Sequence, residues 1–236
     1  MASFRKAGIL FFVLMVPALS YVIYRFGTTN YYTLPRFIPV IDSTTNEPVM
    51  HKVTDQFGER KDTLFRKVPG FNLIDQDGKS VTEVIRKGKI HVANFFFTRC
   101  GTICPKMNTN LSRVQDIFKD RHDLVFLSFS VDPVNDKPAE LTAYAKKMNA
   151  LPGKWYFLTG DKSQIYNLGQ RGYFLPVVDH GVSYGSPDET FIHSEKLVLV
   201  DKEGIIRGFY DGTDKKDIER LTLEIRVLID GYKKQI

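Results

Sequence analysis

The sequence predicts an α/β fold in which helices flank a central mixed sheet. Apolar, β-branched and aromatic runs over residues 90–97 and 124–131 are typical of buried strands. Each run is followed by a segment with helical spacing of apolar residues, from Met107 to Lys119 and from Ala139 to Met148. A late hairpin and a final amphipathic segment follow. This order favours parallel strands at the centre of the sheet and antiparallel ones beside them.

The N-terminal segment predicts a membrane anchor. Arg5 and Lys6 precede the uncharged run 7–24, which Arg25 closes, and its 18 residues are near the lower limit for a spanning helix. Residues 1–6 are expected in the cytoplasm because positive charge favours that side. A cleaved signal peptide is the alternative. The anchor predicts a single-pass protein of a bacterial inner membrane, with its soluble domain in the periplasm or otherwise outside the cytoplasm.

Residues 25–63 are interpreted as a tether, since they are polar and interrupted by prolines, with one short strand near 48–53. Residues 64–236 form the expected domain, and the hydrophobic content of 43% is enough for one core. The formal charge of +6 is partly due to three basic residues near the N-terminus. No block of Lys and Arg with interleaved aromatic residues is present, so the sequence does not indicate nucleic-acid binding.

The remaining elements follow from turn signals and periodicity. Asp75-Gln76-Asp77-Gly78 predicts a turn after a short strand, and Asp201-Lys202-Glu203-Gly204 predicts the turn of the late hairpin. The acidic residues in both turns are assigned to hairpin chemistry rather than to catalysis. The further expected elements are a strand over 154–161, a helix over 163–169, a loop over 177–190, hairpin strands over 191–200 and 205–210, and a helix over 214–230.

Cys100 and Cys104 are the only cysteines, and they lie in the turn between the first buried strand and its helix. A helix that begins near Cys104 directs unpaired backbone N–H groups at the sulfurs, which favours thiolate over thiol. Paired cysteines at the first helix of a strand–helix–strand core, with a closing hairpin and helix, are the thioredoxin arrangement. The Cys-x-x-x-Cys spacing leaves room for both thiolates to hold one soft ion.

Two sulfurs satisfy few ions other than linear Cu(I), so a metal site needs a third ligand. His193 is the best placed of the five histidines, because it begins a hairpin strand that is expected to face the cysteine turn. His180, in the preceding loop, is a candidate auxiliary ligand. The alternatives are a structural disulfide between Cys100 and Cys104, and a packing or surface role for His193.

Four motifs follow one another along residues 65–230. They are Phe96-Phe97-Thr98-Arg99-Cys100-Gly101-Thr102-Ile103-Cys104-Pro105, then Phe129-Ser130-Val131-Asp132-Pro133 with Asp136-Lys137-Pro138, then Trp155-Tyr156-Phe157-Leu158-Thr159-Gly160, then Ile192-His193-Ser194. In order and spacing the chain resembles the Sco/SenC family of membrane-anchored copper proteins. Gly101, Thr102 and Ile192 depart from the residues common in that family, which puts the copper affinity and the reduction potential in doubt.

The resemblance implies a thioredoxin-like domain that binds one copper per chain, as Cu(I) or Cu(II), through Cys100, Cys104 and His193. It further implies a copper metallochaperone that helps to build the dinuclear copper centre of cytochrome c oxidase. The implied partner is the copper-receiving subunit of a respiratory oxidase, with a thiol reductase or another copper carrier as further partners. Asp132, in the second motif, is expected to order a loop or to contact the partner.

A second hypothesis assigns Cys100 and Cys104 as the redox pair of a thiol–disulfide oxidoreductase that reduces the cysteines of a copper-receiving partner. This activity needs no histidine ligand. Apart from it, a conventional enzyme is not expected. A peroxidase or a redox or copper sensor is a third interpretation, and the sequence offers no separate resolving cysteine for it.

Overall fold

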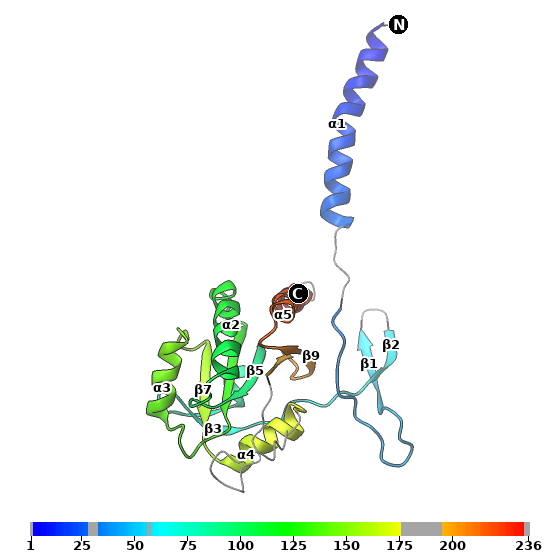
Figure 1. Ribbon diagram of the computed structural model, residues 1–236. Coiled ribbons are helices and arrows are strands. Elements are labelled where there is room, and N and C mark those ends of the chain that lie inside the picture. Colours follow the sequence, from blue (N-terminus) through cyan, green and yellow to red (C-terminus); the bar gives the residue numbers. More distant parts are fainter. Residues whose placement is uncertain (1, 28–32, 56–57, 176–194, 234–236) are drawn as a thin grey trace. The chain divides into compact units, whose positions relative to one another are not determined.

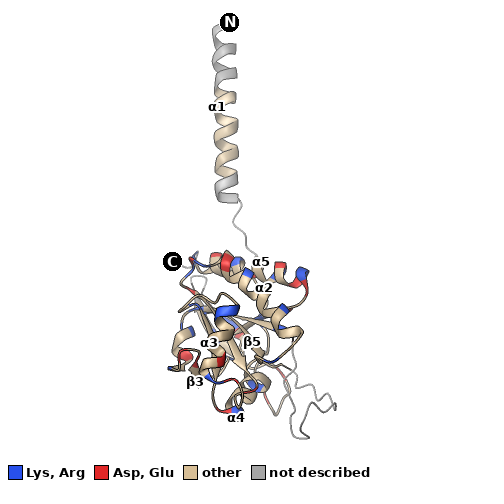
Figure 2. Cartoon of the chain, turned by 60° about the vertical axis from the view of Figure 1, so that its left-hand side comes forward, with Lys and Arg blue, Asp and Glu red and all other residues tan. Residues whose placement is uncertain are grey.

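The computed structural model describes residues 2–27, 33–55, 58–175 and 195–233 (Figure 1). The chain divides into two compact units, Met1–Thr33 and Leu34–Ile236. The first contains helix α1 (Ala2–Gly27), whose residues 11–23 carry no charged side chain (Figure 2). The anchor expected over residues 7–24 is thus helical, and its crossing of a membrane stays a prediction. No helix is long and apolar enough to cross a membrane among the residues that the structure describes.

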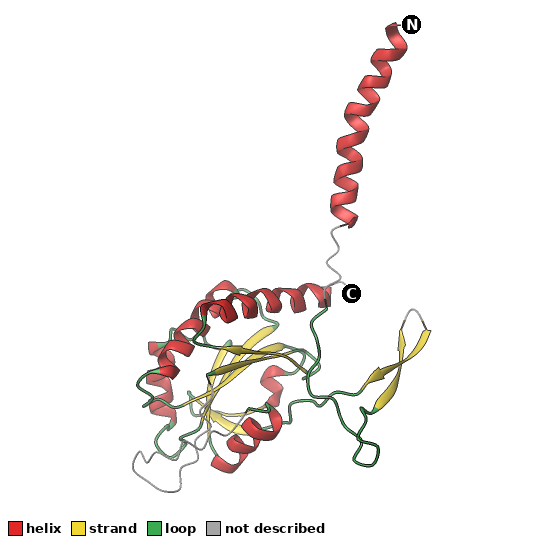
Figure 3. Cartoon of the chain, turned by 45° about the vertical axis from the view of Figure 1, so that its right-hand side comes forward, coloured by secondary structure: helices red, strands yellow, loops and turns green. Residues whose placement is uncertain are grey.

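The second unit contains a seven-stranded mixed sheet with helices on both faces, as expected (Figure 3). The strand order is β4-β3-β7-β6-β5-β8-β9, in which β5, β6 and β7 are parallel and the other pairings are antiparallel. The strands of this sheet are β3 (Asn72–Asp75), β4 (Ser80–Thr82), β5 (Ile90–Phe96), β6 (Leu124–Ser130), β7 (Trp155–Thr159), β8 (Lys196–Val200) and β9 (Ile206–Asp211). The helices are α2 (Ile103–Ile117), α3 (Pro138–Lys147), α4 (Lys162–Asn167) and α5 (Lys215–Lys233), with short helical turns η1 (Glu83–Arg86) and η2 (Leu168–Gly172).

Alternation along the buried strands divides the core between the two faces of the sheet. In β5, Val92 and Phe96 pack in one cluster with residues of α2, α3 and α5. Ala93 and Phe95 pack in a second cluster with residues of α4 and η2. Every residue of β5 is buried, and the strand is mostly apolar, as the central strands of a covered parallel sheet are.

The segment expected to be a tether is folded in part. The second unit begins at Leu34, which is buried, and the backbone carbonyls of Leu34 and Pro35 accept hydrogen bonds from the Arg207 side chain. Farther along, β1 (Met50–Asp55) pairs antiparallel with β2 (Gly58–Thr63) in a separate two-stranded sheet. β1 therefore corresponds to the strand expected near 48–53, whereas its partner strand β2 was not expected from the sequence.

Candidate metal centre

The two cysteines lie where β5 ends and α2 begins, as the sequence predicts. Both are free thiols, with Cys100 partly buried and Cys104 buried. The backbone N–H of Cys100 donates to the carbonyl of Phe97 at 3.2 Å, which closes a tight turn ahead of the helix. The backbone N–H of Cys104 donates to the Cys100 sulfur at 3.4 Å.

The Cys100 sulfur takes the place of a missing helix cap. Thr102, the residue before α2, makes no capping hydrogen bond with its side chain. The first backbone N–H groups of a helix need an acceptor from outside the helix, and here the sulfur supplies one. This arrangement stabilises negative charge on Cys100 more than neutral thiol.

The two thiols are electrostatically unequal. A hydrogen bond from the Cys104 thiol is the main cause that lowers the pKa of Cys100 to about 5. Partial burial opposes this shift, and the backbone N–H groups of Cys104, Thr102 and Ile103 add to it. The same hydrogen bond, together with burial, raises the pKa of Cys104 above its ordinary value. The pair therefore holds one proton at neutral pH, with the thiolate on the more exposed sulfur.

Two buried carboxylates of the β6–α3 loop hold the cysteine loop. Asp136 is fully buried and accepts hydrogen bonds from the Thr98 backbone N–H at 3.0 Å and from the hydroxyls of Thr98 and Ser130, each at 2.5 Å. Asp132 accepts a hydrogen bond from the Arg99 guanidinium at 2.7 Å. The expectation that Asp132 orders a loop is confirmed. Asp136 was named in the second motif, but its role in holding the cysteine loop was not predicted from the sequence.

A chain of buried polar side chains runs beneath the cysteine helix. Trp155 donates to Ser128 at 2.8 Å, and Ser128 donates to the Asn94 carbonyl oxygen at 2.6 Å. The Asn94 amide donates to Asn108 of α2 at 2.9 Å, and Asn108 donates to the Tyr144 hydroxyl at 3.1 Å. This chain of hydrogen bonds was not predicted from the sequence. The available signal was a polar residue inside an otherwise apolar buried strand, at positions 94 and 128.

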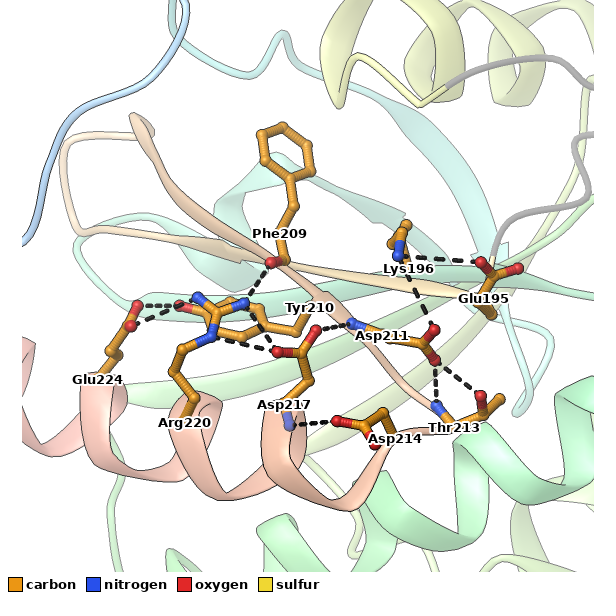
Figure 4. Close-up of polar contacts among 10 residues, drawn as sticks. All are labelled: Glu195, Lys196, Phe209, Tyr210, Asp211, Thr213, Asp214, Asp217, Arg220 and Glu224. Carbon is orange, nitrogen blue, oxygen red and sulfur yellow. Dashed lines mark hydrogen bonds and ion pairs between the residues drawn. The ribbon is translucent and has the colours of Figure 1, made fainter.

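The start of β8 is joined to the turn after β9 by a charged network (Figure 4). Lys196 lies 3.8 Å from the Glu195 carboxylate and 3.9 Å from that of Asp211. The Asp211 carboxylate accepts hydrogen bonds from the backbone N–H and the hydroxyl of Thr213. The backbone N–H of Gly212 donates to the carbonyl of Glu195 at 2.7 Å. These contacts fix the backbone at Glu195 and Lys196, where β8 begins.

The third expected ligand, His193, and the auxiliary candidate His180 lie outside the described residues. Within the described part of the chain, no group of three or more His, Cys, Asp or Glu side chains lies close enough to hold a metal ion. The antiparallel pairing of β8 with β5 brings Lys196, the first residue of β8, to the edge of the sheet where β5 ends. That edge also carries the cysteine loop, in line with the sequence-based expectation for this strand.

The chain is similar to a set of related proteins. A family model described as SCO1/SenC matches residues 48–230. The SCO1 protein homolog of Bacillus subtilis (strain 168) is 32% identical over 168 residues, which are 70% of this chain and 84% of that protein.

Two solved structures share the fold. Copper-bound ScoI of Bradyrhizobium japonicum has 26% sequence identity and a TM-score of 0.57, over 69% of this chain and 99% of that one. BsSco has 30% sequence identity and a TM-score of 0.58, over 69% of this chain and 92% of that one. That protein is described as having a disulfide switch and as a member of the Sco family of cytochrome c oxidase assembly proteins. These likenesses confirm the thioredoxin-like fold.

Proposed function

Because the chain belongs to the SCO1/SenC family, we propose that it is a copper metallochaperone that binds one copper ion through Cys100, Cys104 and His193. The observation that carries the proposal is that the Cys100 sulfur accepts hydrogen bonds from the thiol and the backbone N–H of Cys104, which lower the pKa of Cys100 to about 5. Thiolates are the protein ligands that Cu(I) prefers, and an imidazole allows Cu(II) to be held as well. A relative of known structure, ScoI, is copper-bound.

The chemistry of the pair suits a protein that gives its copper away. Cys100 is partly exposed, so the thiolates of a partner can approach the bound ion and replace the ligands one at a time. The proposed recipient is the copper-receiving subunit of a cytochrome c oxidase, whose dinuclear copper centre the protein would help to assemble. The description of BsSco as a member of a family of cytochrome c oxidase assembly proteins supports this recipient.

The proposed location follows from the N-terminal segment. Helix α1 contains the uncharged run 7–24, flanked by basic residues, and we propose that it anchors the protein in a bacterial inner membrane with the domain on the side away from the cytoplasm. Alkaline carbonate extraction of membranes tests the anchor. Release of the full-length chain by carbonate would contradict it.

The metal site is tested with the reduced full-length chain in detergent. Titration with Cu(II), followed by optical and EPR spectra, should give one bound equivalent with a thiolate-to-Cu(II) charge-transfer band. His193→Ala should abolish stable Cu(II) binding and leave Cu(I) binding through the two sulfurs. His122→Ala, which removes an exposed histidine, is the matched control. A Cu(II) affinity unchanged by His193→Ala would exclude the three-ligand site.

A second candidate function is thiol–disulfide exchange, which the unequal pKa values of the two thiols favour. The Cys100 thiolate would attack a partner disulfide, forming a mixed disulfide and releasing one partner thiolate. Cys104, after losing its proton to water, would then attack the Cys100 sulfur and release the second partner thiolate. The partner is reduced by two electrons, and the chain is oxidised to a Cys100–Cys104 disulfide.

The two functions are separated by their dependence on the histidine. Reduction of a disulfide-bonded copper-site peptide should be lost in Cys100→Ser and in Cys104→Ser, and should be unaffected by His193→Ala. Loss of this activity in His193→Ala would count against a separate oxidoreductase function.

A further inference from the structure

A basic pocket of about 340 Å³ lies at the opposite edge of the sheet from the cysteines. The parallel strands β5, β6 and β7 all begin at this edge, and β5 reaches the cysteine loop only after seven residues, or about 20 Å. The basic pocket is lined by Lys89, Lys119, Arg121, His122, Leu124, Leu151, Pro152, Gly153 and Lys154. Its lining contains four permanently basic residues and no carboxylate.

Most of the positive charge in the basic pocket has no carboxylate partner. Lys89 and Lys119 form no ion pair with any residue that the structure describes. Arg121 is the exception, since Asp123 accepts two hydrogen bonds from it at 3.0 and 2.9 Å. Asp123 is also shared with Lys202, at 3.4 Å, and its side chain is not part of the pocket lining.

Lys154 is the buried one of the three lysines that line the basic pocket. Its side chain is 6% exposed, and its ammonium donates to the backbone carbonyls of Arg121 at 2.6 Å and Leu124 at 3.3 Å. Two of its three N–H groups are therefore used, and both acceptors are neutral. Burial lowers the pKa of Lys154. The charge of Asp123 opposes this shift, and the charges of Arg121 and Lys89 act in the same direction as burial. A buried cation whose hydrogen-bond acceptors are both neutral gains from an anion placed beside it.

We propose that the basic pocket binds a phosphate-type oxyanion, with Lys89, Lys119 and Lys154 as its ligands. Three ammonium groups match the several acceptor oxygens of a phosphate group, and each charge-assisted hydrogen bond is stronger than a neutral one. The volume is at the small end of the range for ligand pockets, which suits a phosphate group with a small organic substituent. Asp123 and Asp120, the two carboxylates whose charges act on Lys154, lie outside the lining.

Such a phosphate group has two possible sources, which differ in charge. A lipid headgroup presents a phosphodiester, and a soluble ligand presents a monoester or inorganic phosphate. The full-length chain in neutral detergent is titrated with pyrophosphate, inorganic phosphate and glycerophosphoglycerol, and binding is followed by calorimetry. Tighter binding of the diester would assign the pocket to a lipid headgroup, and tighter binding of the other two would assign it to a soluble ligand.

The variant Lys89→Gln/Lys119→Gln should weaken binding of the preferred anion by at least about tenfold. The matched control is Lys146→Gln/Lys147→Gln, which removes the same charge from the exposed surface of α3 and should leave binding unchanged. Lys154→Met should also abolish anion binding. If Lys154→Met does not fold, the result for Lys89→Gln/Lys119→Gln alone tests the proposal. Equal loss in the control pair, or no saturable binding by the unaltered chain up to 10 mM anion, would overturn the proposal.

Copper binding serves as an internal check. The basic pocket and the cysteines lie at opposite edges of the sheet, so Lys89→Gln/Lys119→Gln should leave the Cu(II) spectrum unchanged. Failure of the anion site and failure of the metal site are therefore distinguishable in the same protein sample.

Discussion

The side-chain amide of Asn110, in the cysteine-bearing helix α2, donates a 2.8 Å hydrogen bond to the backbone carbonyl of Gly212, which lies 102 positions later in the chain. The N–H of Gly212 in turn donates to the carbonyl of Glu195, two positions after His193. Gly212 thus ties the cysteine helix to the start of β8 through its two backbone polar groups. A side chain at this position has no room, because a Cβ would lie 2.5 Å from Cγ of Met107.

Gly212→Ala is therefore expected to lower the free energy of unfolding by about 1–3 kcal/mol, the usual cost of extra atoms in a packed core. The clash involves a flexible methionine but also the carbonyl oxygen of Glu195, at 3.1 Å, which is part of the backbone. Urea denaturation of the metal-free, reduced full-length chain measures the change.

The control for this variant is Gly231→Ala. A Cβ at Gly231 meets no atom within 4 Å, and the residue lies inside α5. Alanine has the higher helix propensity, so Gly231→Ala should raise stability by about 0.5–1 kcal/mol. If both variants shifted stability in the same direction, the packing argument at Gly212 would be wrong.

Cys100 should react as a thiolate in mildly acidic solution. The rate of alkylation of the reduced, metal-free chain by iodoacetamide should rise with a midpoint near pH 5, because the thiolate is the reacting form. The main cause of the low pKa is the hydrogen bond from the Cys104 thiol. Cys104→Ala should therefore move the midpoint toward the ordinary value of about 8.5, and Cys104→Ser should retain much of the shift.

Mass mapping of the alkylated peptides assigns the reaction to one of the two sulfurs. A midpoint near the ordinary cysteine value in the unaltered chain, or the same midpoint in Cys104→Ala, would contradict the hydrogen-bonded pair.

The sequence predicted the elements whose pattern is local. The strands β5 and β6 were expected because each is a short run rich in apolar, β-branched and aromatic residues, and α2 because its apolar residues follow helical spacing. The strand β2 was missed because its sequence, GERKDT, is polar and largely exposed. Its stability comes from backbone pairing with β1, and backbone pairing leaves no hydrophobic pattern in the sequence.

The same division applies to the candidate site. The cysteine pair and its place at a helix start were predictable because turn, spacing and helix lie within a few residues. The contact between Thr98 and Asp136 joins positions 38 residues apart, and that between Asn110 and Gly212 joins positions 102 apart. Such contacts depend on how the sheet brings loops together, which spacing alone does not encode.

Asp136→Asn should loosen the cysteine loop. The carboxylate accepts three hydrogen bonds from Thr98 and Ser130, and an amide offers only one oxygen to accept them. Because Asp136 is fully buried, the donor left without an acceptor should cost about 1–3 kcal/mol of stability in urea denaturation. Glu140→Gln, an exposed acid in the first turn of α3, should change stability by less than about 0.5 kcal/mol. Equal stability of the two variants would show that the Asp136 bonds are energetically unimportant.

His91 should make the fold sensitive to acid. Its ring is fully buried beside the Tyr173 hydroxyl, at 3.2 Å, and burial holds the pKa of His91 well below its ordinary value, with the charge of Arg86 acting in the same direction. The unfolded chain binds a proton at this histidine below about pH 6.5, and the folded chain does not, so stability is lost as the pH falls from there toward the folded-state pKa. One proton makes the free energy of unfolding change by about 1.4 kcal/mol per pH unit.

His91→Gln should remove that part of the pH dependence of stability between about pH 6 and 5. His122→Gln, at an exposed position, should keep the pH dependence of the unaltered chain. Urea denaturation at a series of pH values measures the difference, and a full slope in His91→Gln would place the acid sensitivity elsewhere in the protein.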